Sequence, residues 1–228
     1  MRHHGNHISI LGWILVLCAV WVPGTVRSET PPPQVKECKS CHRFSPDDPL
    51  NPPKGPDLYF AGNKFKEGWL KRFLKNPEPI RKAGYSLDPG FLQGKPTVAP
   101  PHPALPEAPA EAMAEYLRSL KRPDLVRGQV DPTPLTRSEK VKAKILFERD
   151  YGCIACHESL NLAGQLRGGI SGPSLGNAGL RLQADWVYNF LKNPRRFIPK
   201  GRMPKFDLDD ETAVQLTKFL MTLKGEKK

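Results

Sequence analysis

β-Branched residues are sparse in this sequence and form no run that predicts a strand. Aromatic residues are also few, at 8% of the chain, whereas proline is abundant, with 25 among 228 residues. This composition gives no support to a sheet-rich fold and favours an all-α protein. The length suits one large domain or two small ones.

The one long apolar run, Ile8 to Val22, lies at the N-terminus behind a short basic region. It is followed by Val26-Arg27-Ser28, which places small residues where a signal peptidase cleaves. The run is too short for a comfortable membrane span. We therefore predict that residues 1–28 are a signal peptide and that the mature protein resides in the periplasm, with an uncleaved membrane anchor as the alternative.

Cysteine is scarce, with five in the chain, and Cys18 would leave with the signal peptide. The other four belong to two C-x-x-C-H motifs, namely Cys38, Cys41 and His42, then Cys153, Cys156 and His157. No cysteine is left in the mature chain for a further disulfide or a thiolate ligand.

C-x-x-C-H is the pattern of covalent haem attachment. Each thiol can add to a vinyl group of the porphyrin, and the adjacent imidazole can ligate the iron. A redox disulfide and a zinc site are the alternatives. A thioredoxin-like redox motif is typical of a βαβ context, which is absent here. A zinc site built from both cysteine pairs would not explain why a histidine follows each pair. We expect two haem c groups, each giving a small helical unit a large apolar surface to fold around.

The chain contains an internal repeat. Gly55-Pro56-Asp57-Leu58 returns as Gly172-Pro173-Ser174-Leu175, and Trp69 to Pro77 returns as Trp186 to Pro194 at the same offset. The repeat predicts two domains, residues 29–126 and 136–228, joined by a linker at residues 127–135.

Helices are predicted by apolar spacing and by end signals. A capping-box pattern begins a helix at Thr136 that runs to about Tyr151, and Asp210–Leu223 closes the second domain in the way that Ala110–Leu120 closes the first. Prolines leave no room for a helix before Cys38. We therefore expect the apolar face of Ala110–Leu120 to pack on the other domain or on another protein.

With these motifs the sequence resembles the class I cytochromes c, small all-helical electron carriers, and in particular a dihaem form with two tandem domains. The resemblance implies that His157 is the proximal ligand of the second haem and Met203 the distal one. It also implies that the carbonyl of Pro173 accepts a hydrogen bond from the His157 ring, with Pro56 in the same position of the first domain.

The first domain departs from this pattern at its distal ligand. Where the second has Met203-Pro204, the first has His102-Pro103, and His102 is the one histidine of the mature chain outside the motifs. We expect His102 to ligate the first haem. Met113 is the rival, although it falls at a core position of its helix, and an exposed His102 beside an open haem is the other alternative.

Two imidazoles stabilise ferric iron more than an imidazole and a thioether do. The first haem is therefore expected at lower potential, with electrons passing from it to the second haem and no catalytic residue involved. The alternatives are a subunit of a larger oxidase or reductase complex and a dihaem enzyme, such as a peroxidase or sulfur-compound oxidoreductase, with an open first haem.

Acidic residues are outnumbered, 23 against 35 Lys and Arg, which gives a formal net charge of +12. A basic surface suggests an acidic redox protein, a membrane-bound respiratory complex or an anionic membrane as partner, while basic side chains that merely solvate helices are the alternative. No motif points to nucleic acid. The predicted docking surface consists of five cations near Met203: Lys192, Arg195, Arg196, Lys200 and Arg202.

Overall fold

The computed structural model describes Met1 and residues 30–225, apart from residues 50–53, 86 and 99. The predicted signal peptide, beyond Met1, lies outside the described residues. In the part of the chain that is described, no helix is long and apolar enough to cross a membrane.

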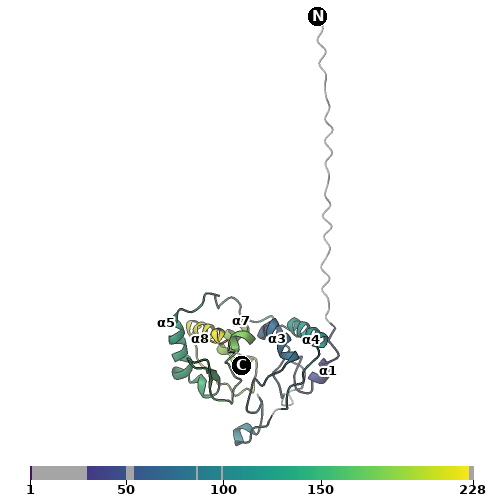
Figure 1. The fold of residues 1–228 in the computed structure, drawn as a ribbon, viewed down its shortest axis with the longest axis horizontal. Coiled ribbons are helices and arrows are strands. Elements are labelled where there is room, and N and C mark those ends of the chain that lie inside the picture. Colours follow the sequence, from purple (N-terminus) through teal and green to yellow (C-terminus); the bar gives the residue numbers. More distant parts are fainter. Residues whose placement is uncertain (2–29, 50–53, 86, 99, 226–228) are drawn as a thin grey trace.

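Figure 1 shows two helical halves lying side by side. The first half contains α1 (Val35–Cys38), α2 (Ala61–Lys64), α3 (Glu67–Lys75), the 3₁₀ turn η1 (Phe91–Gln93) and α4 (Glu107–Ser119). The second contains α5 (Arg137–Ile145), the π-helical turn η2 (Leu146–Asp150), η3 (Cys153–Ala155), β1 (Glu158–Leu160), β2 (Leu166–Gly168), α6 (Ala178–Arg181), α7 (Ala184–Lys192), η4 (Pro194–Arg196) and α8 (Asp210–Thr222).

The sequence repeat is also a repeat of structure. Helices α2, α3 and α4 return in the same order as α6, α7 and α8. In each half the first of these helices is bonded to the end of the last. Gly62 N donates to Leu120 O (2.9 Å), and Gly179 N donates to Leu223 O (2.8 Å). The two halves therefore share one architecture around their buried helical faces.

The antiparallel pair β1 and β2 directly follows the second C-x-x-C-H motif, with Glu158 opposite Gly168 and Leu160 opposite Leu166. Sequence reasoning did not anticipate this hairpin. Its strands are three residues long and carry no alternating apolar pattern of useful length. The fold is thus mainly helical with one small hairpin.

The helix before the second motif begins with the predicted capping box. Glu139 N donates to Thr136 Oγ1 (3.3 Å), and Thr136 N donates to a carboxylate oxygen of Glu139 (2.7 Å). The helix α5 continues directly into η2, where Phe147 is buried against Phe219 of α8 with ring centroids 5.5 Å apart. Two long elements therefore close the second half.

The first half has only the single turn α1 in this position. Its closing helix α4 packs against α2 and α3, and Phe44 stacks on Tyr116 of α4 with centroids 6.3 Å apart. Helix α4 thus packs on helices of its own half, whereas we expected its apolar face to pack on the other domain or on another protein; the second alternative stays a prediction. The aromatic side chain after the motif covers part of the face that α5 and η2 cover in the second half.

The halves join through an isolated antiparallel bridge between Phe65 and Leu182. Two backbone hydrogen bonds flank it, from Lys66 N to Arg181 O (2.9 Å) and from Gln183 N to Lys64 O (3.0 Å). Each paired residue has its counterpart at the same repeat position, so an approximate two-fold axis relates the halves at the bridge.

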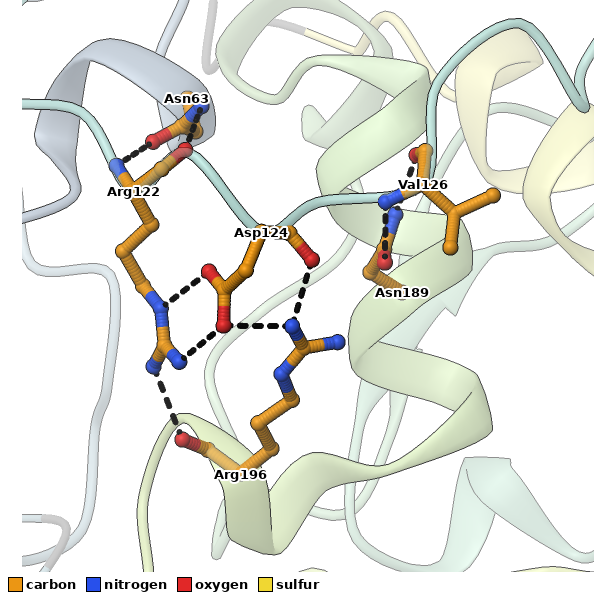
Figure 2. Close-up of polar contacts among 6 residues, drawn as sticks. All are labelled: Asn63, Arg122, Asp124, Val126, Asn189 and Arg196. Carbon is orange, nitrogen blue, oxygen red and sulfur yellow. Dashed lines mark hydrogen bonds and ion pairs between the residues drawn. The ribbon is translucent and has the colours of Figure 1, made fainter.

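The connector, residues 122–126, is bonded to both halves, as Figure 2 shows. Arg122 N donates to Asn63 Oδ1 (2.7 Å) on the first half. On the second half, Asn189 accepts from and donates to the backbone of Val126 (3.0 and 2.7 Å). The region predicted as a linker, residues 127–135, follows, and Asp131 there pairs with Lys218 (2.7 Å).

Asp124 lies at the centre of the connector between two guanidinium groups (Figure 2). Arg122 binds its carboxylate through two nitrogens (3.0 and 2.8 Å), and Arg196 donates to its carbonyl oxygen (2.5 Å) and pairs with the carboxylate. Hydrogen bonds from Arg122 and Arg196 hold the pKa of Asp124 well below its usual range.

Candidate cofactor sites

The first C-x-x-C-H motif forms a tight turn at the end of α1. His42 N donates to Cys38 O (2.9 Å), which closes the turn. The Nδ1 of His42 lies 2.7 Å from Pro56 O, so it donates there and Nε2 remains for a ligand. A Cβ at Gly55 would overlap the His42 ring, which explains glycine at this position.

The second motif repeats this arrangement in η3. His157 N donates to Cys153 O (3.0 Å), and Nδ1 of His157 lies 2.8 Å from Pro173 O. A Cβ at Gly172 would again overlap the imidazole. Burial lowers the pKa of both His42 and His157, and a neutral imidazole is the form that ligates a metal. The repeat has therefore kept the histidine, its carbonyl partner and the glycine beneath it.

Cys38, Cys41, Cys153 and Cys156 are free thiols in the structure. Burial raises the pKa of the Cys38 thiol, and it raises the pKa of the Cys153 thiol to about 11. Redox-active dithiols depend on the opposite shift, toward a stable thiolate. This environment does not favour the redox-disulfide alternative.

His102 lies beside His42, with ring centroids 6.1 Å apart and the rings tilted by 58°. Two imidazoles that ligate one metal ion from opposite sides have centroids roughly 6 Å apart, because a metal–nitrogen bond is about 2 Å long. The Nδ1 of His102 lies 2.9 Å from Pro103 O, and Phe73 of α3 packs on the ring. Burial lowers the pKa of His102 as well. The structure thus brings together the two imidazoles that the sequence assigned to the first haem.

The rival ligand Met113 is 1% exposed and belongs to the core between α4 and its neighbours. Met203 lies half-buried against the core of the second half, in the loop between η4 and α8. Phe197, fully buried, anchors the start of this loop, and Lys192 Nζ donates to Leu208 O (2.6 Å) near its end. The loop that carries Met203 is therefore fixed at both ends.

No group of three His, Cys, Asp or Glu side chains in the described residues is arranged to hold a bare metal ion. Haem iron needs only the two axial ligands from the protein, because the porphyrin supplies the others.

Buried cations test whether the sites suit haem, which carries two carboxylates. Lys64 and Arg181, at the same position of the two repeats, are both buried, and no ion pair between either of them and a carboxylate is found among the described residues. Arg181 donates to neutral oxygens, Ser174 O (2.7 Å) and Asn177 Oδ1 (3.3 Å), which leave its charge uncompensated. Lys64 Nζ lies 4.9 Å from the Trp186 ring centroid, and Arg181 Cζ lies 6.0 Å from that of Trp69. Each cation therefore lies over a tryptophan of the other half.

Burial lowers the pKa of Lys64 to about 7 and that of Arg181 to about 10. The indole Nε1 of Trp186 is buried without a hydrogen-bond partner among the described residues. Buried positive charge and an unpaired donor are costly unless an anion accepts them. A group with carboxylates at the junction of the two halves would satisfy them, and the residues present therefore fit haem.

Three of the five cations of the predicted docking surface are paired or half-buried. Lys192 pairs with Asp210 (2.8 Å), Arg196 pairs with Asp124 (2.5 Å), and Arg202 is half-buried. The exposed cations of the five are Arg195 and Lys200.

Sequence reasoning missed the pair of buried cations and the orphaned indole. The repeat alignment contained the signal, because it places Lys64 and Arg181 at the same position of two corresponding short segments, Ala61–Lys64 and Ala178–Arg181.

No protein-family model, curated protein or solved structure matches the chain. The functional proposal therefore depends on the residues of this chain.

Proposed function

We propose that the protein is a periplasmic electron carrier with two covalently attached haem c groups. The observation that carries this proposal is the duplicated C-x-x-C-H motif in which each histidine directs Nδ1 to a proline carbonyl, Pro56 O or Pro173 O. That hydrogen bond fixes the tautomer and leaves Nε2 as the ligand atom. A redox dithiol does not need this hydrogen bond, and a zinc ion needs more protein ligands than the described residues bring together.

When bound, haem supplies a one-electron couple that can be reduced and reoxidised. The protein residues hold it and set its potential. The cysteines would anchor it, and His42 with His102 in the first half and His157 with Met203 in the second would supply its iron ligands. Lys64 and Arg181 would neutralise its carboxylates between the halves, so that buried charge of both signs is paired.

The two sites differ in their distal ligand. A second imidazole favours ferric iron more than a thioether does, so the site of His42 and His102 is the low-potential one. Electrons would enter there and leave from the site of His157 and Met203. The placement of His102 beside His42 opposes the alternative of an enzyme with an open first haem.

A redox titration followed by absorbance tests this proposal. The purified protein should contain two haems per chain and titrate in two waves. In His102→Ala the lower midpoint potential should rise, or the first haem should become high-spin. The higher midpoint potential should stay unchanged.

Met113→Leu is the matched control, because it conserves volume and would disturb the first haem only if Met113 were its ligand. A chain without covalent haem would refute the proposal. A single wave unchanged by His102→Ala would refute the assignment of His102.

A further inference from the structure

One segment of the first half lies against the second half's site. It comprises residues 78–85 and 87–91 and is called here the bridging loop. Ser174 N donates to Ile80 O (2.7 Å), and Arg81 donates to Ser171 O. Lys82 pairs with the buried carboxylate of Glu158 (2.5 Å).

These contacts flank the proximal side of the second site. Glu158 follows His157 directly, while Ser171 and Ser174 enclose Gly172 and Pro173, whose carbonyl holds the imidazole. The bridging loop thus supports the chain on both sides of the carbonyl that orients His157.

The same loop also contacts the distal side. Arg202 precedes Met203, and its guanidinium lies over the Phe91 ring, with Cζ 3.8 Å from the centroid. It donates to Tyr85 O and to Ser171 O (both 3.2 Å). One guanidinium therefore ties the Met203 loop to the bridging loop and to the proximal segment.

Asp88 gives the bridging loop its shape. Its side chain is 4% exposed and accepts from Gly90 N (3.0 Å), Thr97 N (2.6 Å) and Thr97 Oγ1 (3.0 Å). The turn that presents Phe91 is thus held by hydrogen bonds that do not involve Arg202, so Arg202 binds it at little cost in conformational entropy.

We propose that Phe91 and the bridging loop are positioning elements for the second site. Through them the first half holds the loop that carries Met203 in its closed position. The inference rests on the proposed function, since it takes Met203 as an iron ligand. A thioether in a loop is displaced when the loop opens locally, and contacts that bind only the closed loop reduce the open population. The contacts of His102 at the first site come from its own half, from His42, Phe73 and Pro103.

Cyanide binding to the oxidised protein measures this opening, since cyanide can take the iron only after the thioether leaves. In Phe91→Ala, cyanide should bind the second haem about fivefold faster, the factor that a cation–π contact of this kind supports. The first haem should be unaffected. The absorption band of thioether-ligated ferric iron reports the second haem separately.

Leu92→Ala is the matched control, because Leu92 belongs to the same turn η1 but is 83% exposed. It should bind cyanide as the wild type does. Arg202→Lys keeps the charge but loses the planar fork that reaches two carbonyls, so it should also accelerate binding.

Unchanged cyanide kinetics in both Phe91→Ala and Arg202→Lys, with two haems bound, would overturn the inference and leave the proposed function intact. Equal acceleration by Leu92→Ala would also overturn it. A wild-type chain without haem would instead refute the proposed function.

Discussion

The two halves of the chain place the same motif in different settings. In the second half, α5 and η2 form a continuous helical element before the motif, and Phe147 packs on Phe219 of α8. In the first half, one turn precedes the motif, and Phe44 on Tyr116 covers part of the corresponding face. The second half therefore has one more helical element packed on its closing helix than the first half has, and we expect the first half to depend more on its cofactor and on its partner half.

Removing the cysteines that are proposed to attach haem should have the largest effect on stability, and the effect should differ between the two halves. We expect the pair of substitutions Cys38→Ala and Cys41→Ala to remove one haem and to lower Tm by roughly 10 °C, the shift that a few kcal/mol gives in a protein of this size. Cys153→Ala with Cys156→Ala should remove one haem with a smaller loss, because α5, η2 and α8 still pack. Haem content and thermal unfolding by circular dichroism measure both.

Equal losses in the two pairs would contradict the comparison and show that the missing helix does not matter to stability. Retention of two haems in either pair would contradict the assignment of that motif.

Core truncation gives a smaller and more local test. Phe147→Ala should cost about 3–5 kcal/mol, since it empties a fully enclosed site between η2 and α8. Phe44→Ala should cost less, about 2 kcal/mol, because Phe44 is 8% exposed and its site can refill with solvent. Denaturant unfolding of the haem-loaded variants gives both values.

A larger cost for Phe44→Ala would mean that this one side chain, and not the cofactor, replaces the missing helix.

The features that the sequence predicted are local ones. The capping box at Thr136 and the helices beginning near Ala110 and Asp210 depend on spacing and end signals within one segment, and the structure confirms them with boundaries shifted by up to three residues. The pairing of His42 with His102 was also accessible, because the repeat aligned His102 with Met203.

The features that the sequence did not predict depend on how the halves meet. The bridge between Phe65 and Leu182 pairs a single residue from each half, and no strand pattern in the sequence predicts it. The bridging loop has no apolar period or end signal that predicts where it packs, and its docking follows from the position of Arg202 across the junction. Long-range packing of this kind leaves no periodic trace in a single sequence.

The connector offers the smallest effect and tests whether the halves unfold together. Asp124 receives both Arg122 and Arg196, yet its side chain is 44% exposed, so solvent screening limits the value of the pairs. Asp124→Asn should cost at most about 1 kcal/mol at neutral pH. Because its pKa in the folded protein is depressed, the stabilisation is present above the ordinary range of an aspartate, about pH 4, and is lost as the pH falls toward the folded value. The wild type should therefore lose its advantage over Asp124→Asn on acidification.

Calorimetry at neutral and acidic pH measures this, with Asp131→Asn, outside the connector, as control. If Asp124→Asn splits one transition into two while Asp131→Asn does not, the connector couples the halves. A single transition in both variants would assign that coupling to the Phe65–Leu182 bridge and the buried cations beside it.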